Sequence, residues 1–531
     1  MRLSYESLQK QEEMYRKAGI HIPSYSLEKV RKRTVEHPTW LHFGAGNIFR
    51  AFMARLQQRL LEQGEAESGI VVAEAFDEEL IDRLYQPFDC LSILVTLKGD
   101  GSFDKEVIAS VAEGLKPSTD LDTLRRIFRD PGLQMVSMTI TEKGYALQDL
   151  QGSYLPGIQS DLEAGPSSAH TMMGLLTALL LHRYQNGAAP LAVVSMDNCS
   201  HNGEKLSQAI WTIAKEWYER GKVSQDFLTY LQDETQVAFP WTMIDKITPR
   251  PAQSVERELE ALGLEGMEPL TTQKHTYAAA FVNAEAPEYL VIEDAFPNGR
   301  PALEKAGVYF TDREIVNDTE RMKVTTCLNP LHTALAVYGC LLDYKTIAEE
   351  MQDPDLVRLV RGIGEKEGLK VLKHPGILDP KRFLEEVLTK RLPNPYMPDT
   401  PQRIATDTSQ KIPVRYGETL KAYASNLSDL HYIPLAIAGW FRYLLGKDDR
   451  LETMEVSPDP MLAPLMKALQ DVRVGVPESY REQLKPILQN EHLFGINLAD
   501  TCLGERIEEY FVRMLEGAGA VRKLLQEECV A

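Results

Sequence analysis

The sequence predicts an α/β protein with a parallel-sheet domain in its N-terminal part and a mainly α-helical C-terminal domain. From Trp40 on, short apolar runs such as "GIVVAEAF" and "LSILVTL" alternate with helical patterns such as "IFRAFMARLQQRLLEQG". This alternation is typical of βαβ units, and runs that are apolar on both faces predict strands covered by helices on each side. After about Pro287 the strand-like runs become rare, and from Glu320 on helical patterns predominate.

The same patterns divide the chain of 531 residues into three segments. Residues 1–38 are expected to form an N-terminal helical arm, because "YESLQKQEEMYRKAG" has helical spacing and ends at a glycine. Residues 39–288 are expected to form the parallel-sheet domain, and residues 289–531 the helical domain. A chain of this length is too long for one ordinary hydrophobic core.

The composition is that of an acidic protein expected in the cytoplasm. Acidic residues number 77 against 58 basic ones, and the formal charge of −19 argues against nucleic acid or anionic membranes as partners. The first residues lack the apolar core of a secretory signal. The longest apolar run, "MMGLLTALLL", is about half as long as a transmembrane helix. We therefore expect no membrane partner.

A turn with two glycines joins the first predicted strand to the first predicted helix. In "HFGAGNIFRAF", Gly44 and Gly46 allow the backbone to turn tightly and to approach a pyrophosphate at the helix N-terminus. Phe49 replaces the third glycine of the G-x-G-x-x-G motif, and two glycines in such a loop are also ordinary turn residues. Because a second strand and two acids follow, we predict a Rossmann-type, dinucleotide-binding domain over residues 39–288.

The two acids, Glu74 and Asp77, lie about thirty residues after Gly46, close to the usual distance for a ribose-binding acid. An acid that holds the ribose 2′-hydroxyl repels a 2′-phosphate, so it favours NAD over NADP. Asp77 is the first choice, with a helix N-cap as its structural alternative, and Glu74 is the second choice.

The stretch "KVTTCLNPLH", at the start of an apolar helical pattern, carries candidate catalytic groups. Zinc is not expected, because the six cysteines lack C-x-x-C pairs and metal-ligand spacing. Burial would lower the pKa of Lys323 and make it a general base, while Asn329 could donate to an oxyanion and His332 could orient the substrate. The structural alternative is a solvated lysine, an N-cap before Pro330 and a core histidine.

Five segments in the same order resemble the polyol-specific long-chain dehydrogenases, the mannitol dehydrogenase family. They are "HFGAGNIFR", "SMTITEKGY", "SMDNCSHNG", "MIDKITPR" and the stretch from Glu320 to His332. The resemblance implies an NAD-dependent secondary-alcohol dehydrogenase or ketose reductase. Its cofactor-binding residues would be Gly44, Gly46, Asn47, Ile48, Arg50 and, beside the nicotinamide, Thr141.

The resemblance also implies a catalytic set, which comprises Asn198, Asp245, Glu320, Lys323, Asn329 and His332. Lys323 would be the general acid or base, and Asn198 and Asn329 the oxyanion donors. Glu320 would assist proton passage, and Asp245 would be the active-site aspartate.

One departure from the family pattern lies in the catalytic stretch. Five residues, "VTTCL", separate Lys323 from Asn329, where the family has four. One extra residue rotates a helical side chain by about 100°. Either a helix that restarts at Asn329 or Pro330, or a π-type bulge, would restore the arrangement.

The segment "RIATDTSQKIPVRYGETL" resembles the hexuronate-reducing branch of the family. It supplies Lys411 and Arg415, and Arg250 is a third candidate for binding a substrate carboxylate. The expected reaction is the interconversion of D-mannonate and D-fructuronate with NAD(H). The alternatives are the mannitol–fructose reaction, the reduction of tagaturonate, and a regulator that binds NAD or a sugar acid on the same scaffold.

Overall fold

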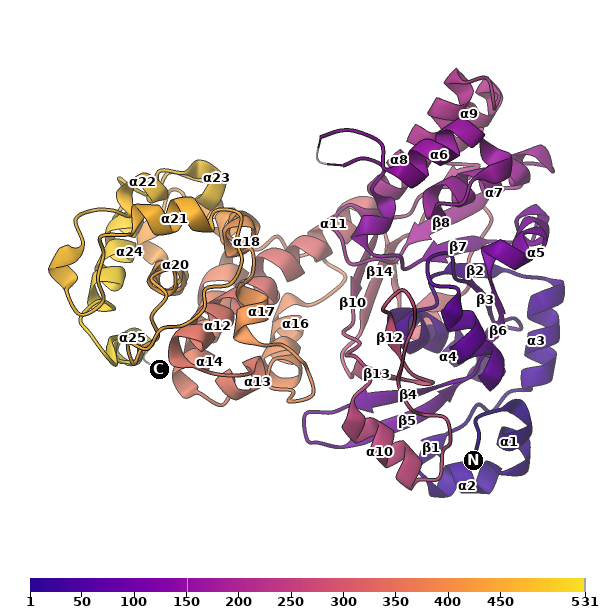
Figure 1. Ribbon diagram of the computed structural model, residues 1–531, viewed down its shortest axis with the longest axis horizontal. Helices are drawn as coiled ribbons and strands as arrows, with labels where there is room; N and C mark the ends of the chain where they lie inside the picture. The colour runs from indigo at the N-terminus through magenta and orange to yellow at the C-terminus, as the bar shows by residue number, and fades with distance from the viewer. Residues whose placement is uncertain (150, 530–531) are drawn as a thin grey trace. The chain divides into compact units, whose positions relative to one another are not determined.

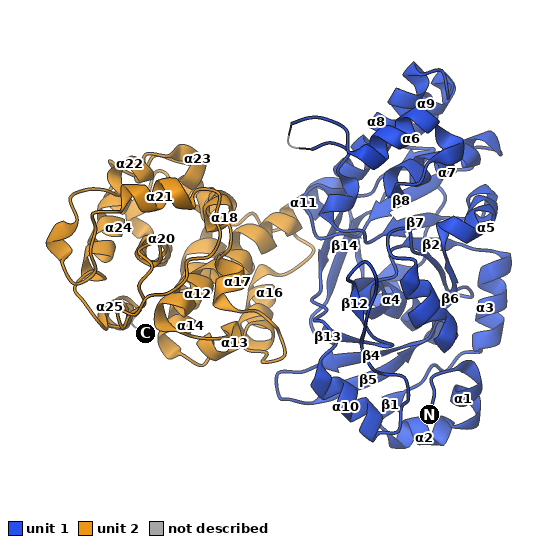
Figure 2. Ribbon diagram, viewed as in Figure 1, with its two compact units in different colours: residues 1–317 blue, residues 318–531 orange. Residues whose placement is uncertain are grey.

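The computed structural model describes residues 1–149 and 151–529, which fall into two compact units (Figure 2). Unit 1 comprises residues 1–317, and unit 2 begins at residue 318. The boundary therefore falls inside α11 (Arg313–Met322), later than the expected one after residue 288. The reason is that β14 (Tyr289–Glu293) and β15 (Tyr309–Thr311) still pair within a sheet of unit 1.

Unit 1 is built around a six-stranded sheet in which neighbouring strands are parallel (Figure 1). Its strands, in spatial order, are β6 (Val111–Leu115), β3 (Ile70–Ala73), β2 (Trp40–Phe43), β7 (Met135–Met138), β8 (Leu191–Ser195) and β9 (Val237–Ala238). Counted along the chain, this is the order 3-2-1-4-5-6 of a Rossmann-type fold. The predicted parallel-sheet domain is thus confirmed.

Helices and accessory strands cover both faces of this sheet. Leu41 and Phe43 of β2 belong to one hydrophobic cluster, and Trp40 belongs to the other. The first cluster is completed by α5 (Pro117–Arg129), α7 (Met172–Gln185), α8 (Asn202–Glu219) and α9 (Gln225–Gln232). The second is completed mainly by α4 (Ala54–Glu62) and the smaller sheets. The strands are apolar on both faces because each face packs against such a layer.

Three smaller sheets complete unit 1. One contains β1 (Ile20–His21), β5 (Phe103–Ile108), β4 (Ser92–Leu97) and β13 (Phe281–Glu285). The second joins β10 (Thr242–Asp245) to β14 and β15, and the third is the pair β11 (Leu270–Thr271) and β12 (Tyr277–Ala278). The remaining helices are α1 (Tyr5–Lys10), α2 (Glu12–Lys17), α3 (Leu27–Glu36), α6 (Pro156–Ala164) and α10 (Gln253–Ala261).

The first 38 residues, for which a helical arm was expected, form α1 to α3 and also contribute a strand to unit 1. Ile20 and His21 of β1 pair with Lys105 and Glu106 of β5 in parallel. This pairing joins the N-terminal segment to an accessory sheet of unit 1.

Unit 2 is helical and is organised around α12 (Asn329–Leu342), which packs against α14, α17 and α20. The unit contains α13 (Ile347–Glu350), α14 (Pro354–Arg361), α15 (Leu369–Val371), α16 (Pro380–Glu386), α17 (Pro401–Ala405), α18 (Thr408–Arg415), α19 (Gly417–Ala422) and α20 (Tyr432–Tyr443). It continues with α21 (Leu462–Ala468), α22 (Lys485–Leu488), α23 (Glu491–Phe494), α24 (Cys502–Arg513) and α25 (Ala520–Glu528). These helices confirm the predicted class of the C-terminal domain.

A buried carboxyl group lies against α12. Glu350 has no measurable exposure, and neither of its carboxyl oxygens has a hydrogen-bond partner among the described residues. A Cβ atom at Gly339 would lie 2.1 Å from Glu350 Oε1, so the carboxyl group occupies the space that this glycine leaves. Burial, together with the nearby carboxylates of Asp353 and Glu349, raises the pKa of Glu350 well above 4.5.

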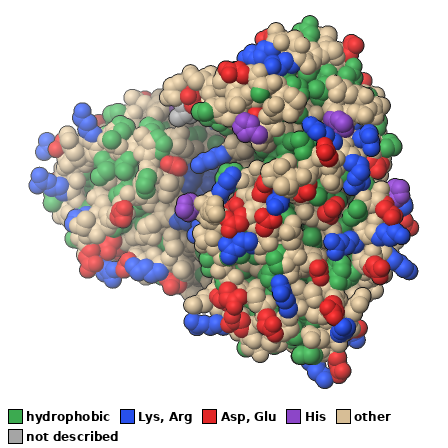
Figure 3. Space-filling view, turned by 45° about the vertical axis from the view of Figure 1, so that its right-hand side comes forward, with side chains coloured by type: hydrophobic (Ala, Val, Ile, Leu, Met, Phe, Trp, Pro, Cys, Tyr) green, Lys and Arg blue, Asp and Glu red, His purple; other side chains and the backbone are tan. Residues whose placement is uncertain are grey.

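The surface carries charges of both signs. On the face shown in Figure 3, acidic and basic side chains are interspersed over unit 1. Across the part of the chain that the structure describes, the search for a helix both long and apolar enough to span a bilayer finds none.

The raised pKa of Glu350 predicts how stability depends on pH. The folded protein holds this proton more tightly than the unfolded chain does. The protonated carboxyl group of Glu350 therefore makes its full contribution to the free energy of unfolding below pH 4.5, and this contribution is lost as the pH rises through the raised pKa. The Glu350→Gln side chain carries no charge at any pH. The difference between its melting temperature and that of the wild type should therefore increase from pH 5 to pH 8, by roughly 2–4 °C for each kcal/mol that the wild type loses in its free energy of unfolding.

Thermal unfolding at several pH values measures this difference. Glu455→Gln is the matched control, because Glu455 is an exposed glutamate of unit 2 and is not among the carboxylates that raise the pKa of Glu350. A Glu350→Gln curve that stays parallel to the wild-type curve over this range would contradict the prediction.

Candidate active site

The glycine turn after β2 needs each of its glycines for a different reason. Gly44 has φ +105°, and a Cβ atom there would lie 2.2 Å from the carbonyl oxygen of Thr139. Gly44 N also donates to the carbonyl oxygen of Ala73 at the end of β3. A Cβ at Gly46, by contrast, would meet no described atom within 4 Å. Gly44 therefore permits strand packing, whereas Gly46 leaves its backbone open to a ligand.

The residues after the turn are ordered by a buried arginine. Arg50 lies in the π-helix η1 (Phe49–Met53) and is 2% exposed. Its Nη1 donates to Ala279 O at 2.7 Å and its Nη2 to Asn47 Oδ1 at 2.8 Å. Burial lowers the pKa of Arg50. Arg50 thus fixes the Asn47 side chain, a positioning role that sequence reasoning did not foresee.

The structure distinguishes the two candidate ribose acids. Glu74 directly follows β3, and its Oε2 accepts from Ala45 N of the glycine turn at 2.7 Å. Its Oε1 accepts from Phe76 N and Asp77 N. Asp77 is 3% exposed and accepts from Thr272 Oγ1 at 2.6 Å. Glu74, the second choice for the ribose-binding acid, is therefore the one that is bonded to the glycine turn. Its contact with the ribose stays a prediction.

A pocket of about 290 Å³ in unit 1 brings several predicted residues together. It is lined by Ile48, Thr141, Glu142, Met196, Asp197, Asn198, Ile244 and Lys246. Thr141 and Asn198 follow the C-terminal ends of β7 and β8, beside the point where the strand order reverses around β2. Ligands of open α/β sheets bind at such a point. The pocket thus unites Ile48, Thr141 and Asn198.

Thr141 has an unusual backbone conformation that Asp197 stabilises. Its φ of 65° and ψ of 158° are rare for a β-branched residue and cost about 1–3 kcal/mol. Asp197 accepts from the backbone N–H groups of Ile140 and Thr141, both at 2.9 Å, and from the Tyr145 hydroxyl at 2.5 Å. Burial raises the pKa of Asp197. The only sequence signal for this role was that Asp197 precedes Asn198.

The segment after β10 places an aspartate and a lysine in the interior. Asp245 ends β10 and is 5% exposed. Lys246 Nζ donates to Glu285 O at 2.7 Å and to Glu288 Oε2 at 3.0 Å, while burial lowers the pKa of Lys246. The Arg250 side chain is exposed, and its carbonyl oxygen accepts from an asparagine of β13.

In unit 2, a π-helix accommodates the extra residue of the catalytic stretch. The π-helix η7 spans Lys323–Cys327, and Leu328 N donates to Lys323 O, five residues back, at 3.1 Å. Leu328 then leaves helical geometry, with φ −131° and ψ −62°, before α12 begins at Asn329. Both expected solutions, the bulge and the restart, are present. Lys323 is 3% exposed, and Glu320 lies one turn earlier in α11.

His332 lies on α12 between a carboxylate and several cations. Its Nε2 is 3.3 Å from Asp399 Oδ2, and its side chain is 16% exposed. Burial, followed by the charges of Arg415, Arg403 and Lys411, lowers the pKa of His332 to about 3. The imidazole is therefore neutral near pH 7, and its Nε2 makes no hydrogen bond within the described residues.

Lys411 and Arg415 of α18 contribute two of these cations. Arg415 Nη1 donates to Thr333 Oγ1 at 2.6 Å and to Asn329 O at 3.3 Å. Lys411 Nζ donates to the carbonyl oxygen of Ile404 at 2.9 Å. Burial lowers the pKa of Arg415 to about 10 and that of Lys411 to about 8. Unit 2 thus brings Asn329, His332 and two of the three predicted carboxylate-binding residues into one neighbourhood.

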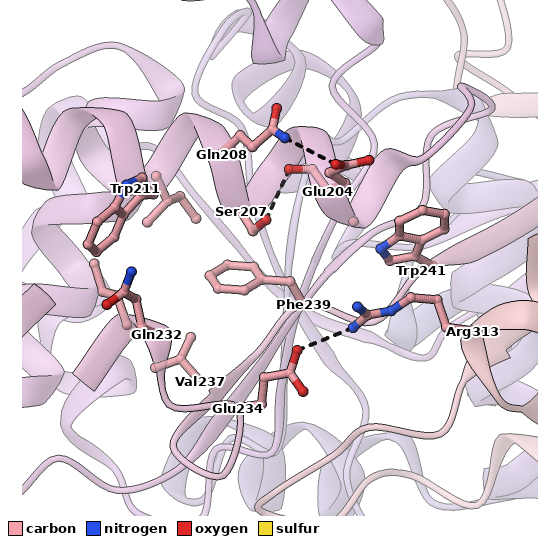
Figure 4. A pocket seen from close by; sticks show the side chains of 13 residues that line it. Glu204, Ser207, Gln208, Trp211, Gln232, Glu234, Val237, Phe239, Trp241 and Arg313 are labelled. Atoms are coloured by element: carbon pink, nitrogen blue, oxygen red, sulfur yellow. Dashed lines mark hydrogen bonds and ion pairs between the residues drawn. The ribbon is translucent and has the colours of Figure 1, made fainter. Parts of the chain in front are cut away.

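A larger cavity, of about 450 Å³, lies between α8, α9 and the edge strand β9 (Figure 4). Trp211, Phe239 and Trp241 line it, and Arg313 pairs with Glu234 at 3.4 Å on its rim. None of the predicted site residues is among the described residues that line this cavity. Among the described residues, no three His, Cys, Asp or Glu side chains are grouped to hold a metal ion.

Known proteins match both units of the chain. The family model of the mannitol dehydrogenase Rossmann domain matches residues 38–305, and that of the mannitol dehydrogenase C-terminal domain matches residues 316–515. The chain is 53% identical over 536 residues to the D-mannonate oxidoreductase of Thermotoga maritima, with 99% of both chains covered. It is 29% identical to the polyol:NADP oxidoreductase of Gluconobacter oxydans, over 85% of this chain and 88% of that one.

A solved structure is also similar. Mannitol 2-dehydrogenase of Pseudomonas fluorescens, in a ternary complex with NAD and D-mannitol, matches with a TM-score of 0.70 and 26% identity over 99% of each chain.

The two glycines of the turn should respond differently to alanine. Gly44→Ala combines a positive φ with a Cβ only 2.2 Å from Thr139 O, and should lower the free energy of unfolding of unit 1 by at least about 1–3 kcal/mol. Gly46→Ala meets no described atom and should leave that free energy within about 0.5 kcal/mol. Denaturant unfolding of both variants measures the difference, and equal destabilisation would contradict it.

Proposed function

Because the chain belongs to the mannitol dehydrogenase family of oxidoreductases, as its motifs predicted, we propose that it interconverts D-mannonate and D-fructuronate with NAD(H). The observation that carries this proposal is the cationic neighbourhood of Asn329 and His332, in which Arg415 is bonded to the backbone of Asn329. Such a neighbourhood suits the carboxylate that a hexuronate has and a neutral polyol lacks.

The glycine turn supports a dinucleotide cofactor. A bound dinucleotide would supply the redox chemistry, as hydride acceptor in the form of NAD⁺ and as hydride donor in the form of NADH. Gly46 leaves the backbone open at a helix N-terminus, where a pyrophosphate is favoured, and Glu74, which accepts from Ala45 N, would face the ribose. Ile48 and Thr141 line the pocket where the strand order reverses, so they would contact the nicotinamide half.

Proton transfer is assigned to Lys323. In the oxidation direction its amine accepts the proton of the substrate hydroxyl, and in the reduction direction its ammonium returns a proton to the alkoxide oxygen. Burial in η7 keeps the amine away from bulk water, and Glu320 passes the proton between Lys323 and solvent. Asp245, buried at the end of β10, is the active-site aspartate of the proposed catalytic set.

Two amides and a neutral imidazole complete the proposed catalytic groups. The side-chain N–H groups of Asn198 and Asn329 donate to the oxyanion that develops at the substrate carbonyl. His332 orients the substrate through a hydrogen bond, because its buried Nε2, 3.3 Å from Asp399 Oδ2, makes no hydrogen bond within the described residues. Arg415 and Lys411 of unit 2 bind the carboxylate, and Arg250 is the third candidate for this role.

The proposal is tested by the change in NADH absorbance with D-fructuronate, D-tagaturonate and fructose. We expect turnover of D-fructuronate with the highest kcat/KM. Turnover of fructose alone would favour a mannitol 2-dehydrogenase. Turnover of none of the three, with NADH still bound, would favour a binding protein on the same scaffold.

Lys323→Ala should reduce kcat by about 10²- to 10⁴-fold, because it removes the proton acceptor, while NADH affinity stays within a few-fold. Steady-state kinetics and NADH fluorescence titration measure the two quantities. Lys345→Ala is the matched control, since Lys345 is an exposed lysine of unit 2 paired with Asp343. An unchanged kcat in Lys323→Ala would refute the role of Lys323 as base.

The pKa of about 8 for Lys411 predicts a pH dependence of substrate capture. Lys411 is charged below this pH and neutral above it, so kcat/KM for D-fructuronate should fall as the pH rises through about 8. Lys411→Arg stays charged, and the ratio of its kcat/KM to the wild-type value should therefore increase above pH 8. A ratio that is constant from pH 7 to pH 9.5 would contradict the role of Lys411.

A further inference from the structure

An exposed aromatic side chain lies close to the residue that is bonded to the glycine turn. Phe76, two residues after Glu74, is 68% exposed, which is a high value for so large an apolar group. Its backbone N–H donates to Glu74 Oε1 at 2.8 Å, while Glu74 Oε2 accepts from Ala45 N at 2.7 Å. One carboxylate therefore joins Phe76 to the glycine turn.

A lysine from a distant part of the chain lies over this ring. Lys274 Nζ is 4.5 Å from the centroid of the Phe76 ring and also donates to the carbonyl oxygen of Phe76. An ammonium at this distance is attracted to the face of the ring. Lys274 and Glu74 thus contact the same residue, the first at its carbonyl group and the second at its N–H group.

The turn that carries Lys274 is held against the loop after β3. This turn connects β11 and β12, and Thr272 Oγ1 donates to Asp77 Oδ2 at 2.6 Å. Gln273 N donates to Glu79 Oε2 at 2.9 Å. The position of Lys274 is therefore set by two further hydrogen bonds between these segments.

This location corresponds to the adenosine end of a dinucleotide site. In a Rossmann-type domain the pyrophosphate lies at the first helix N-terminus, and the adenosine ribose lies at the C-terminal end of the second strand, which here is β3. An acid at that strand end contacts the ribose, and a nearby cation accommodates a 2′-phosphate. Here Glu74 occupies the strand end where such an acid is expected, and Lys274 is a cation that contacts the same residue as Glu74.

We infer that Phe76 and Lys274 form the adenosine end of the dinucleotide site, and that Lys274 enables the protein to bind NADP as well as NAD. The inference rests on the dinucleotide cofactor of the proposed function. Phe76 offers an aromatic face on which adenine stacks. The Lys274 ammonium attracts the 2′-phosphate and offsets the repulsion from Glu74, whose oxygens are engaged with three backbone N–H groups.

Binding of NADH and NADPH, measured by fluorescence titration of the full chain without substrate, tests this inference. The wild type should bind both. Lys274→Gln should raise the ratio of the Kd for NADPH to that for NADH by about tenfold or more, which is about 1.4 kcal/mol of binding free energy. Lys274→Arg keeps the positive charge and should restore the ratio. Phe76→Ala should weaken the binding of both nucleotides by about 5- to 100-fold.

Two exposed residues of unit 1 serve as matched controls. Lys305→Gln removes another exposed lysine, which pairs with Glu65, and Tyr218→Ala removes another exposed aromatic ring, which is 40% exposed. Neither should change either Kd. An unchanged ratio in Lys274→Gln, unchanged Kd values in Phe76→Ala, or a wild type that binds NADH but no NADPH would overturn the inference.

The outcome is separable from that of the proposed reaction. Absence of D-fructuronate turnover together with the expected changes in Kd would leave the adenosine assignment supported and would reject the substrate. Absence of binding of both nucleotides would reject the cofactor and the adenosine assignment together.

Discussion

The close contact between Gly44 and the carbonyl oxygen of Thr139 is the constraint on which the site in unit 1 depends. A Cβ atom at residue 44 would lie 2.2 Å from that oxygen, so without the glycine the ends of β2 and β7 could not lie as closely side by side at the point where the strand order reverses. Because they do, the glycine turn, the loop of Thr141 and the loop of Asn198 emerge at one edge of the sheet. Apart from Lys274, the groups assigned to the cofactor in unit 1 follow strands that end at this edge.

Several candidate site residues, both cofactor-binding and catalytic, lie in surroundings that fix their conformation or their charge. Asp197 stabilises the strained backbone of Thr141, and the π-helix η7 carries Lys323 in the interior. Asp399 lies beside His332, where burial and the surrounding cations keep the imidazole neutral. Strain and buried charge are typical of sites in which the surrounding structure fixes the reacting groups in advance.

Sequence patterns predicted the strands and helices better than their assembly. The runs "TWLHFG", "GIVVAEAF", "LQMVSMTIT" and "PLAVVSMDN" form β2, β3, β7 and β8 of the parallel sheet, as their apolar character indicated. "LSILVTL" has the same character, yet it forms β4 of a separate sheet, because strand pairing depends on partners far along the chain. The later unit boundary has the same origin, since β15 pairs with β14 across a long connection.

By itself, the sequence determined the order of the two domains, the glycine turn, the likeness to the family and the identity of the candidate groups. Those features are local, because periodicity and turn chemistry are encoded by neighbouring residues. Only the tertiary structure decided that Glu74 rather than Asp77 is bonded to the glycine turn, that η7 absorbs the extra residue, and that Lys274 lies over Phe76. These features depend on burial and on contacts between distant segments, which local sequence patterns do not encode.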